Sequence, residues 1–383
     1  MKAIRAFGMK LALPKSAELK ETALGELTTR AQRESKTVPP DALHIVPPPK
    51  FWTPLKQAVG GTLLEGNLPD DYHARFILRV PSEWNGRLVV AAASGITDVF
   101  TYDLYFSDFL LSRGYALAVT DKGVRRAVLD GDTVLMPLVP EASVARWADR
   151  LEALAKLSRE QLARLRGRGP ERVYAVGLSN GGYIARRAAE SPSKFIDGAV
   201  EISGVLWRAD SGNLLRELPP ALRGEAGVFP AADGRWAPVA KLYRDFYWQA
   251  VLQMFVSDLD PEYQGPIERY DLDLRPAEVR ERIRAFENTG DLQVPLISIA
   301  GRRDYLIGCE GHALAYRTLI EQRGKQELHR LELVDDASHI DTNHELFSFV
   351  EPLMPRAHAA FEELVALVER EPALTGPSSP RPR

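Results

Sequence analysis

Short runs of hydrophobic residues recur along the chain, separated by stretches in which hydrophobic and polar positions follow helical spacing. Several runs are continuous rather than alternating, which is typical of strands buried on both faces of a parallel sheet. The strands predicted in this way cover residues 74–80, 87–92, 115–120, 172–177, 198–202, 295–300 and 330–334.

Amphipathic segments lie between these runs and predict helices. Tyr102, Phe106 and Leu110 recur at helical spacing before Gly114, which is a plausible helix stop. Apolar positions follow the same spacing over 144–165, 311–323 and 361–368. Regular alternation of strand and helix predicts an α/β fold with a doubly wound, mostly parallel sheet and right-handed crossovers.

The interval 207–293 breaks this rhythm, because it offers no convincing parallel strand and is crowded with large side chains. An insertion of that length between two strands must lie outside the sheet, so we predict a helical cap. The expected organisation is an N-terminal arm and first strand region (1–72), a core in two parts (73–206 and 294–372), the cap (207–293) and a disordered tail (373–383).

One motif indicates chemistry. Gly177-Leu-Ser179-Asn-Gly181 joins the predicted strand 172–177 to a helix. A serine between a strand and a helix requires a very sharp turn, and glycines two positions before and after it remove the Cβ clashes of that turn. The hydroxyl then projects from the carboxyl edge of the sheet, above a helix N-terminus whose free N–H groups attract negative charge. Ser179 is the predicted nucleophile.

The motif and its setting resemble the α/β-hydrolase superfamily over residues 73–370. The G-x-S-N-G-G form after Arg172-Val-Tyr resembles polyhydroxybutyrate depolymerases and feruloyl esterase-like enzymes. Pro81-Ser-Glu-Trp-Asn-Gly-Arg87, with the later Arg113-Gly-Tyr-Ala-Leu-Ala-Val-Thr-Asp121, resembles the tannase and feruloyl esterase group and hydroxybutyrate oligomer hydrolases. The tannase group places cysteines beside the catalytic serine and histidine, whereas this chain has Leu178 and Ile340 there.

The acid of a serine triad is expected after a later strand. Asp304 follows the predicted strand 295–300 and is the expected acid, with Asp291, Asp335 and Asp336 as rivals. The base is expected after the last strand, where His339 lies, and His312 and His344 are its rivals. Ser179, Asp304 and His339 follow the order that this fold uses.

The triad predicts an acyl-enzyme mechanism, in which His339 takes the proton of Ser179 and Asp304 orients the imidazole. Backbone N–H groups must stabilise the oxyanion. The N–H of Asn180, at the helix start, is one expected donor. The second should come from the small-residue turn after strand 87–92, where we favour Ile96, followed by Gly95.

Composition limits the other choices. Hydrophobic residues make up 45% of the 383-residue chain and the formal net charge is −3, which gives no field to attract nucleic acid or an anionic membrane. No cluster of His or Cys has metal-ligand spacing and no phosphate loop is present, so neither a metal nor another cofactor is expected. The lone Cys309 and the weak, lysine-interrupted N-terminal apolar run favour a cytoplasmic location.

The leading hypothesis is a serine hydrolase of carboxylic esters, acting on hydroxyacid oligomers, polyester-like chains or aromatic acid esters. An acyltransferase with the same triad and a catalytically silent binding protein are the alternatives. The expected partner is a small-molecule or oligomeric ester, and a homo-oligomer is possible. Four cap aromatics are candidates for the substrate pocket or, equally, for the core of the cap: Trp207, Tyr247, Trp248 and Phe255.

Overall fold

The computed structural model describes residues 19–28, 55–69, 71–95, 99–124, 142–225 and 227–370. The candidate oxyanion residue Ile96 and the expected disordered tail 373–383 lie outside the described residues.

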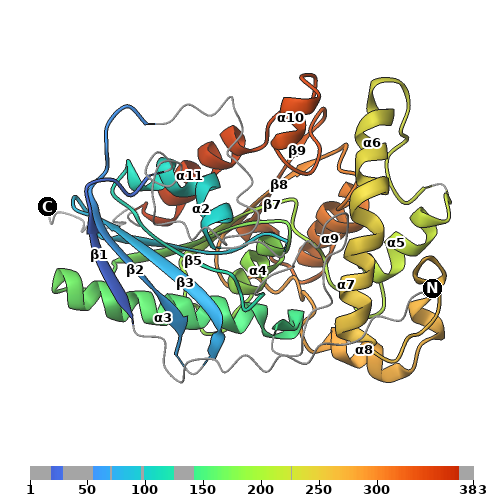
Figure 1. The fold of residues 1–383 in the computed structure, drawn as a ribbon, viewed down its shortest axis with the longest axis horizontal. Helices are drawn as coiled ribbons and strands as arrows, with labels where there is room; N and C mark the ends of the chain where they lie inside the picture. The colour runs from blue at the N-terminus through green and yellow to red at the C-terminus, as the bar shows by residue number, and fades with distance from the viewer. Residues whose placement is uncertain are drawn as a thin grey trace, which may run out of the picture.

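Within the described residues, a sheet of nine strands organises the fold, in the order β1-β2-β3-β5-β4-β6-β7-β8-β9 (Figure 1). From β5 to β9 all neighbouring strands are parallel. The strands are β1 (Lys20–Leu24), β2 (Gly61–Leu68), β3 (Asp71–Pro81), β4 (Arg87–Ala92), β5 (Ala116–Thr120), β6 (Arg172–Leu178), β7 (Gly198–Ile202), β8 (Leu296–Gly301) and β9 (His329–Val334). The predicted α/β-hydrolase fold is confirmed, and β4 and β7 have the predicted limits.

The N-terminal region, for which we expected an arm and a first strand region, has two described strands. It contributes β1 and β2 to the sheet, and the pairs β1–β2, β2–β3 and β3–β5 are antiparallel. Strand β1 is polar and mostly exposed, and β2 is only half-buried. Edge strands of this kind lack the continuous apolar run that identifies a buried parallel strand, so the sequence pattern missed them.

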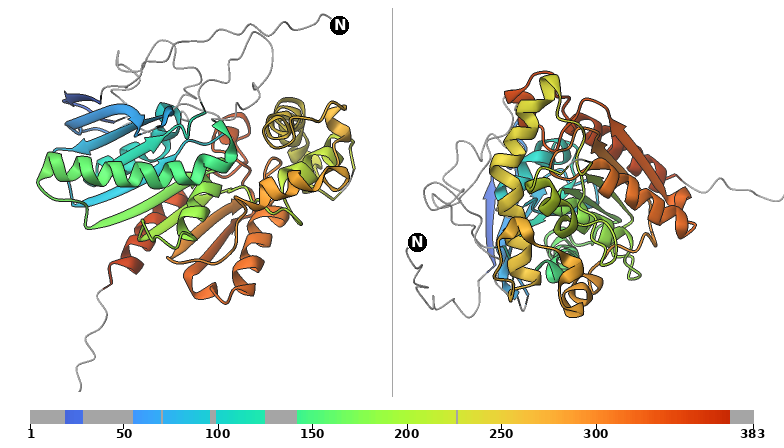
Figure 2. Two further views of the ribbon diagram at one scale, coloured as in Figure 1. Left: turned by 90° about the horizontal axis from the view of Figure 1, so that it is seen from below. Right: turned by 90° about the vertical axis from the view of Figure 1, so that its right-hand side faces the viewer.

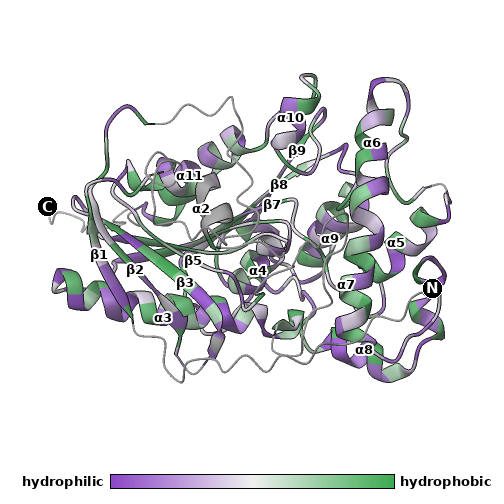
Figure 3. Cartoon of the chain, in the orientation of Figure 1, coloured by the Kyte–Doolittle hydropathy of each residue, from purple (hydrophilic) through white to green (hydrophobic). Residues whose placement is uncertain are grey.

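Helices cover both faces of the sheet. The face with α3 (Trp147–Arg166), α4 (Asn180–Ala189) and α9 (Ala315–Gln322) holds one hydrophobic cluster. The face with α2 (Val99–Leu111) and α11 (Met354–Val368) holds the other. Hydrophobic and hydrophilic residues alternate around α3 and α7 (Gln249–Leu259) as the ribbon turns (Figure 3). This is the pattern expected of helices with one buried side.

The described part of the insertion between β7 and β8 contains helices and no strand. Helices α5 (Leu214–Leu222), α6 (Ala237–Tyr243), α7 and α8 (Ala277–Arg284) gather at one end of the molecule (Figures 1 and 2). A π-helical turn, η4 (Arg244–Trp248), joins α6 to α7. The shorter segments are η2 (Val144–Arg146), η3 (Gly234–Trp236), η5 (Ile267–Arg269), η6 (Leu272–Leu274), η7 (Glu310–Leu314), η8 (Gln326–Leu328) and α10 (Thr342–Leu346).

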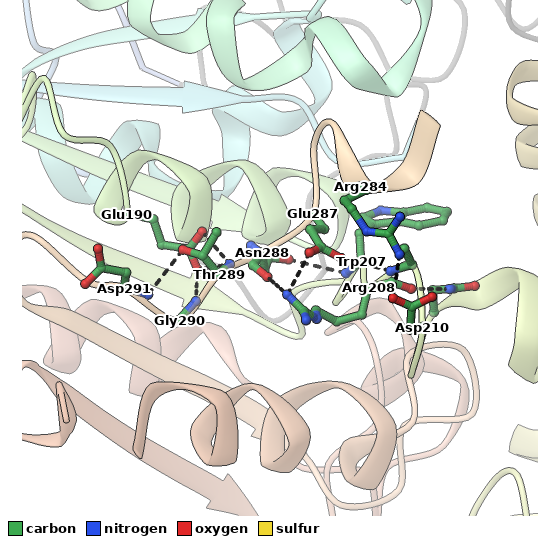
Figure 4. Close-up of polar contacts among 12 residues, drawn as sticks. Glu190, Trp207, Arg208, Asp210, Arg284, Glu287, Asn288, Thr289, Gly290 and Asp291 are labelled. Carbon is green, nitrogen blue, oxygen red and sulfur yellow. Dashed lines mark hydrogen bonds and ion pairs between the residues drawn. The ribbon is translucent and has the colours of Figure 1, made fainter. Parts of the chain in front are cut away.

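The two connections of this insertion run side by side where they leave and rejoin the sheet (Figure 4). The N–H of Asn288 donates to the carbonyl of Trp207 at 3.0 Å, and the N–H of Ala209 donates to the Glu287 carboxylate at 2.9 Å. We call these paired segments, 207–210 and 284–291, the neck.

The neck is tied to the core by one buried carboxylate. Glu190, at the end of α4, accepts hydrogen bonds from the N–H groups of Thr289 at 3.0 Å and Gly290 at 2.8 Å (Figure 4). It also accepts from the hydroxyl of Tyr316 at 2.8 Å. Because the acceptor is fully engaged, removing it would leave buried donors without partners. The base of the insertion is therefore fixed to the nucleophile helix.

A partly buried histidine predicts how stability depends on pH. His358 of α11 donates from Nε2 to the Tyr105 carbonyl at 3.1 Å and stacks on Phe109. Burial lowers the pKa of His358 to about 4 from an ordinary 6.5. The unfolded chain therefore binds a proton first as the pH falls, and stability present above pH 6.5 is lost towards pH 4.

We expect His358→Gln to reduce the loss of stability that occurs as the pH falls. Relative to wild type, the free energy of unfolding of the variant should decline less between pH 6.5 and pH 4, by about 1–3 kcal/mol. Denaturant unfolding of both proteins at a series of pH values measures the difference. Parallel curves over this range would contradict the assignment.

Candidate active site

The turn after β6 has an unusual backbone. Ser179 adopts φ 58° and ψ −118°, a conformation that non-glycine residues rarely occupy, and α4 begins at the next residue. Its N–H donates to the Ile202 carbonyl of β7 at 2.9 Å, and its carbonyl accepts from Tyr183 of α4 at 3.0 Å. These bonds hold the serine at the carboxyl edge of the sheet, between the strand and the helix.

The glycines of the motif allow backbone segments to approach each other. A Cβ on Gly177 would lie 2.0 Å from the Gly181 carbonyl oxygen, and one on Gly181 would lie 2.5 Å from the Ala92 oxygen of β4. A Cβ on Gly182 would lie 2.7 Å from the Cα of Gly204. Real Cβ atoms do not reach such distances, so each glycine is required by its surroundings.

A continuous chain of hydrogen bonds links the three predicted triad residues. Nε2 of His339 lies 3.0 Å from Oγ of Ser179, and Nδ1 of His339 lies 2.7 Å from Oδ2 of Asp304. All three side chains are buried, with Ser179 9% exposed. An ionised carboxylate only accepts hydrogen bonds, so Nδ1 carries the proton and Nε2 is free to accept from the hydroxyl.

The carboxylate of Asp304 is itself fixed. Its second oxygen, Oδ1, accepts hydrogen bonds from the N–H groups of Leu306 and Ile307, both at 2.8 Å. The same loop is bonded to the cap, since Nε1 of Trp248 donates to the Tyr305 carbonyl at 2.6 Å. The acid therefore has a single orientation, which the cap helps to maintain.

The rival acids are engaged elsewhere. Asp335 pairs with Arg302 at 2.8 Å, and Asp336 pairs with Arg235 at 2.8 Å. Asp291 faces Lys325 at 3.5 Å. None of these contacts joins the Ser179–His339 pair.

The rival bases also have other contacts. Nδ1 of His312 accepts from the Leu206 N–H at 2.8 Å, and its Nε2 lies 2.9 Å from the Glu217 carboxylate. Nδ1 of His344 lies 2.6 Å from the Val350 carbonyl. His312 therefore joins the start of the insertion to α5, while His344 fixes the chain after α10.

The predicted oxyanion donors lie around the same turn. Asn180 begins α4 directly after Ser179, so its N–H belongs to the free N-terminal turn of that helix. Its side-chain Nδ2 donates to the Gly95 carbonyl at 3.4 Å. Gly95, in the loop after β4, has φ 49°, and this bond places it beside the nucleophile turn. The favoured Ile96 falls outside the described residues.

The four pocket candidates separate into two groups, and the pocket prediction is corrected for two of them. Trp207 and Phe255 are fully buried, pack edge-to-face on each other at 4.8 Å, and offer no free surface to a ligand. Trp248 is 7% exposed and stacks on Phe229. Tyr247 alone among the four keeps substantial exposure, at 37%.

A tyrosine that the sequence pattern did not single out completes the surroundings of the triad. The ring of Tyr243, at the end of α6, packs edge-on against His339 with centroids 6.3 Å apart. Its hydroxyl accepts from Nδ2 of Asn343 at 2.5 Å, and Tyr247 lies against its other side at 5.3 Å. Burial and the nearby Asp304 carboxylate raise the pKa of Tyr243 well above its usual value. The phenol therefore stays neutral beside the imidazole.

A second residue that the sequence pattern did not indicate, Asp341, fixes the segment that follows His339. The buried carboxylate of Asp341 accepts from the N–H groups of Leu353 at 2.6 Å and Met354 at 3.1 Å, at the start of α11. Burial raises the pKa of Asp341 to about 6. No local motif distinguishes either Tyr243 or Asp341, because their roles depend on contacts between distant segments.

Within the described ranges, no group of three or more His, Cys, Asp or Glu side chains is arranged to hold a metal ion. No described helix combines the length and the apolar character that crossing a bilayer requires.

Comparison with known proteins gives one curated sequence relative. The chain is 29% identical over 138 residues to a mono(2-hydroxyethyl) terephthalate hydrolase of Piscinibacter sakaiensis, a match that covers 34% of this chain and 23% of the relative. The match thus spans about a quarter of the length of that relative. No protein-family profile matches the sequence.

Solved structures share the fold over most of the chain. Feruloyl esterase B of Aspergillus oryzae superimposes with a TM-score of 0.54 at 11% identity, covering 85% of this chain and 80% of that one. Another esterase of Aspergillus oryzae gives a TM-score of 0.53 at 10% identity, covering 86% and 81%. These similarities confirm the α/β-hydrolase fold.

The close approach at Gly181 yields a test of the turn. Gly181→Ala should lower the free energy of unfolding by about 2 kcal/mol or more, because the new methyl group collides with the backbone of β4 rather than with a side chain that can move. Thermal and denaturant unfolding measure the loss.

Gly169→Ala is the matched control, since nothing lies within 4 Å of a Cβ at Gly169. It should leave stability unchanged or slightly raised. Equal stability of the two variants would show that the turn has room for a side chain.

Proposed function

We propose that the protein is a serine hydrolase of carboxylic esters, with Ser179 as nucleophile, His339 as general base and Asp304 as the orienting acid. The observation that supports this most directly is the unbroken hydrogen-bond chain from Asp304 through His339 to Ser179. A strained serine between a strand and a helix N-terminus is the setting in which such a nucleophile is exposed to substrate.

Acylation begins when the Ser179 hydroxyl attacks the ester carbonyl. Nε2 of His339 takes the hydroxyl proton and then returns it to the departing alcohol. Asp304 keeps the imidazole in the Nδ1–H form and stabilises the imidazolium, while the N–H groups of Leu306 and Ile307 keep the carboxylate in line.

The negative charge on the carbonyl oxygen needs donors that are already in place. The Asn180 N–H supplies one from the first turn of α4, with the positive end of the helix dipole behind it. The turn after β4, in which Gly95 and Ile96 lie, supplies the second. Water then attacks the acyl-enzyme with His339 again as base, which releases the acid.

The substrate class that we propose is an ester with an aromatic acyl group. Tyr247 is partly exposed to solvent, and its ring packs against that of Tyr243. Tyr243 in turn contacts the imidazole of His339. The name of the curated relative gives a terephthalate ester as its substrate, and a structural neighbour is named as a feruloyl esterase. Both names describe aromatic acids, which an exposed tyrosine binds by stacking.

Ser179→Ala should abolish ester hydrolysis, with kcat reduced by about 10⁴-fold or more, because the variant lacks the hydroxyl on which the acyl-enzyme forms. Asp304→Asn should reduce kcat by about 10⁴-fold, as the same exchange does in serine proteases, since the imidazole then takes the wrong tautomer. Hydrolysis of p-nitrophenyl and aromatic esters measures both, and a fluorophosphonate probe should label wild type but not Ser179→Ala.

Asp335→Asn and Ser112→Ala are matched controls, because both side chains make exposed contacts away from the triad. Both should retain wild-type kcat. Undiminished activity of Ser179→Ala on every ester would overturn the proposed function.

Tyr247→Ala tests the substrate class. Loss of one stacking partner, worth about 0.5–1.5 kcal/mol, should lower kcat/KM for benzoyl and feruloyl esters by about 3- to 10-fold and leave acetyl esters within twofold. Leu274→Ala, at a cap position that is 80% exposed, is the control and should change neither. An equal loss on acetyl and aromatic esters would argue against stacking on this ring.

A further inference from the structure

A lysine lies buried beside the turn that follows β4. Lys122 lies two residues after the end of β5 and its exposed fraction is 0%. Its ammonium group donates from Nζ to the Ala93 carbonyl at 2.7 Å and lies 5.0 Å from the ring centroid of Trp147. Fully buried lysines are rare because the ammonium group loses its hydration, so this contact needs an explanation.

The backbone around Lys122 is built to aim its side chain. Lys122 has φ 51°, in the left-handed region, and Gly123 follows with φ 82°. The Lys122 N–H donates to Oγ1 of Thr120 at 3.0 Å, and its carbonyl accepts from Nη1 of Arg150 at 2.7 Å. Oδ1 of Asp121 accepts from the Gly123 N–H at 2.8 Å. Three hydrogen bonds thus fix the backbone of this turn.

The acceptor of Lys122 is the first residue of the loop that faces the nucleophile. Ala93 follows β4 and its N–H still donates to the Thr120 carbonyl at 2.8 Å, while Ser94 and Gly95 have left the sheet. Gly95 accepts from the Asn180 side chain at 3.4 Å. The loop is therefore held at its start by Lys122 and further along by Asn180.

A role in packing alone does not account for an amine at this position. A methionine would fill nearly the same volume without the cost of burying a charge. The amine adds one thing, a donor that fixes the plane of the peptide between Ala93 and Ser94. Because a peptide unit is planar, fixing its carbonyl also fixes the direction of its N–H.

We propose that Lys122 is a positioning residue of the ester-cleaving site, whose bond to the Ala93 carbonyl fixes the first peptide unit of the loop that leads to the proposed oxyanion donor Gly95. The inference rests on the proposed function. It assigns Lys122 no contact with substrate. Its protonated form makes the stronger, charge-assisted bond to the Ala93 carbonyl.

The charge of this lysine responds to pH in an accessible range. The pKa of Lys122 is lowered to about 7, chiefly by burial; Asp121 acts to raise this pKa, and Arg150 acts to lower it. The amine is therefore charged below this pH and neutral above it. Turnover should show an alkaline decline of severalfold with a midpoint near the pKa of Lys122.

Lys122→Met is the first test. We expect kcat to fall by about 10- to 100-fold, KM to change by less than twofold, and the alkaline decline of kcat to disappear. Thermal unfolding should show that the variant is folded. A kcat–pH profile with the wild-type decline would overturn the inference.

Asp121→Asn is the second test, and it does not depend on the stability of the methionine variant. Asparagine retains the Oδ1 acceptor for the Gly123 and Arg75 N–H groups but removes the anion that favours the charged lysine. The pKa of Lys122 should fall, and the alkaline decline should move to lower pH. A decline that stays in place would count against the lysine as its source.

The two proposals fail separately. If Ser179→Ala keeps full activity, the ester-hydrolase assignment is wrong and the role of Lys122 falls with it. If Ser179→Ala is inactive while Lys122→Met keeps the wild-type kcat and pH profile, only the inference about Lys122 is wrong.

Discussion

The sharp turn at Ser179 is the constraint on which the rest of the site depends. Its φ of 58° belongs to a backbone conformation that costs about 1–3 kcal/mol for a residue with a side chain. The surrounding backbone over-determines it: α4 presses on β4 through Gly181 and against the loop after β7 through Gly182. The strain is retained because β4 and β7 pair with β6 on its two sides and restrict how the backbone can pass from β6 into α4.

Around the other members of the proposed triad, backbone N–H groups hold carboxylates in place. Asp304 is bonded by the N–H groups of its own loop, and Asp341 is bonded by the N–H groups at the start of α11. His339 lies two residues before Asp341, and the bond from its Nδ1 to Asp304 orients its ring. The imidazole is thus oriented by Asp304, whose own geometry is fixed by backbone N–H groups, and Asp341 fixes the chain that follows His339; such fixed geometry is what preorganisation requires.

The sequence indicated the features that local patterns determine. Buried parallel strands, the glycine motif and the order of Ser179, Asp304 and His339 follow from apolar runs and turn chemistry. The antiparallel edge was missed because polar, half-exposed strands such as β1 have no such run. Lys122 and Tyr243 were missed for a different reason: each has its role only through a contact with a segment that lies far away in the chain. For Trp207 and Phe255 the sequence allowed either a pocket or the core of the cap, and their complete burial favours the core.

The cap is part of the site rather than a cover placed above it. Tyr243 of α6 contacts the imidazole, and Trp248 of η4 is bonded to the loop that contains Asp304. The hydrophobic cluster beneath α3 and α4 continues into the cap without a break. A movement that opened the neck would have to break the bonds at Glu190 and would strain the Trp248–Tyr305 bond. The cap therefore contacts both the imidazole of His339 and the loop that contains Asp304.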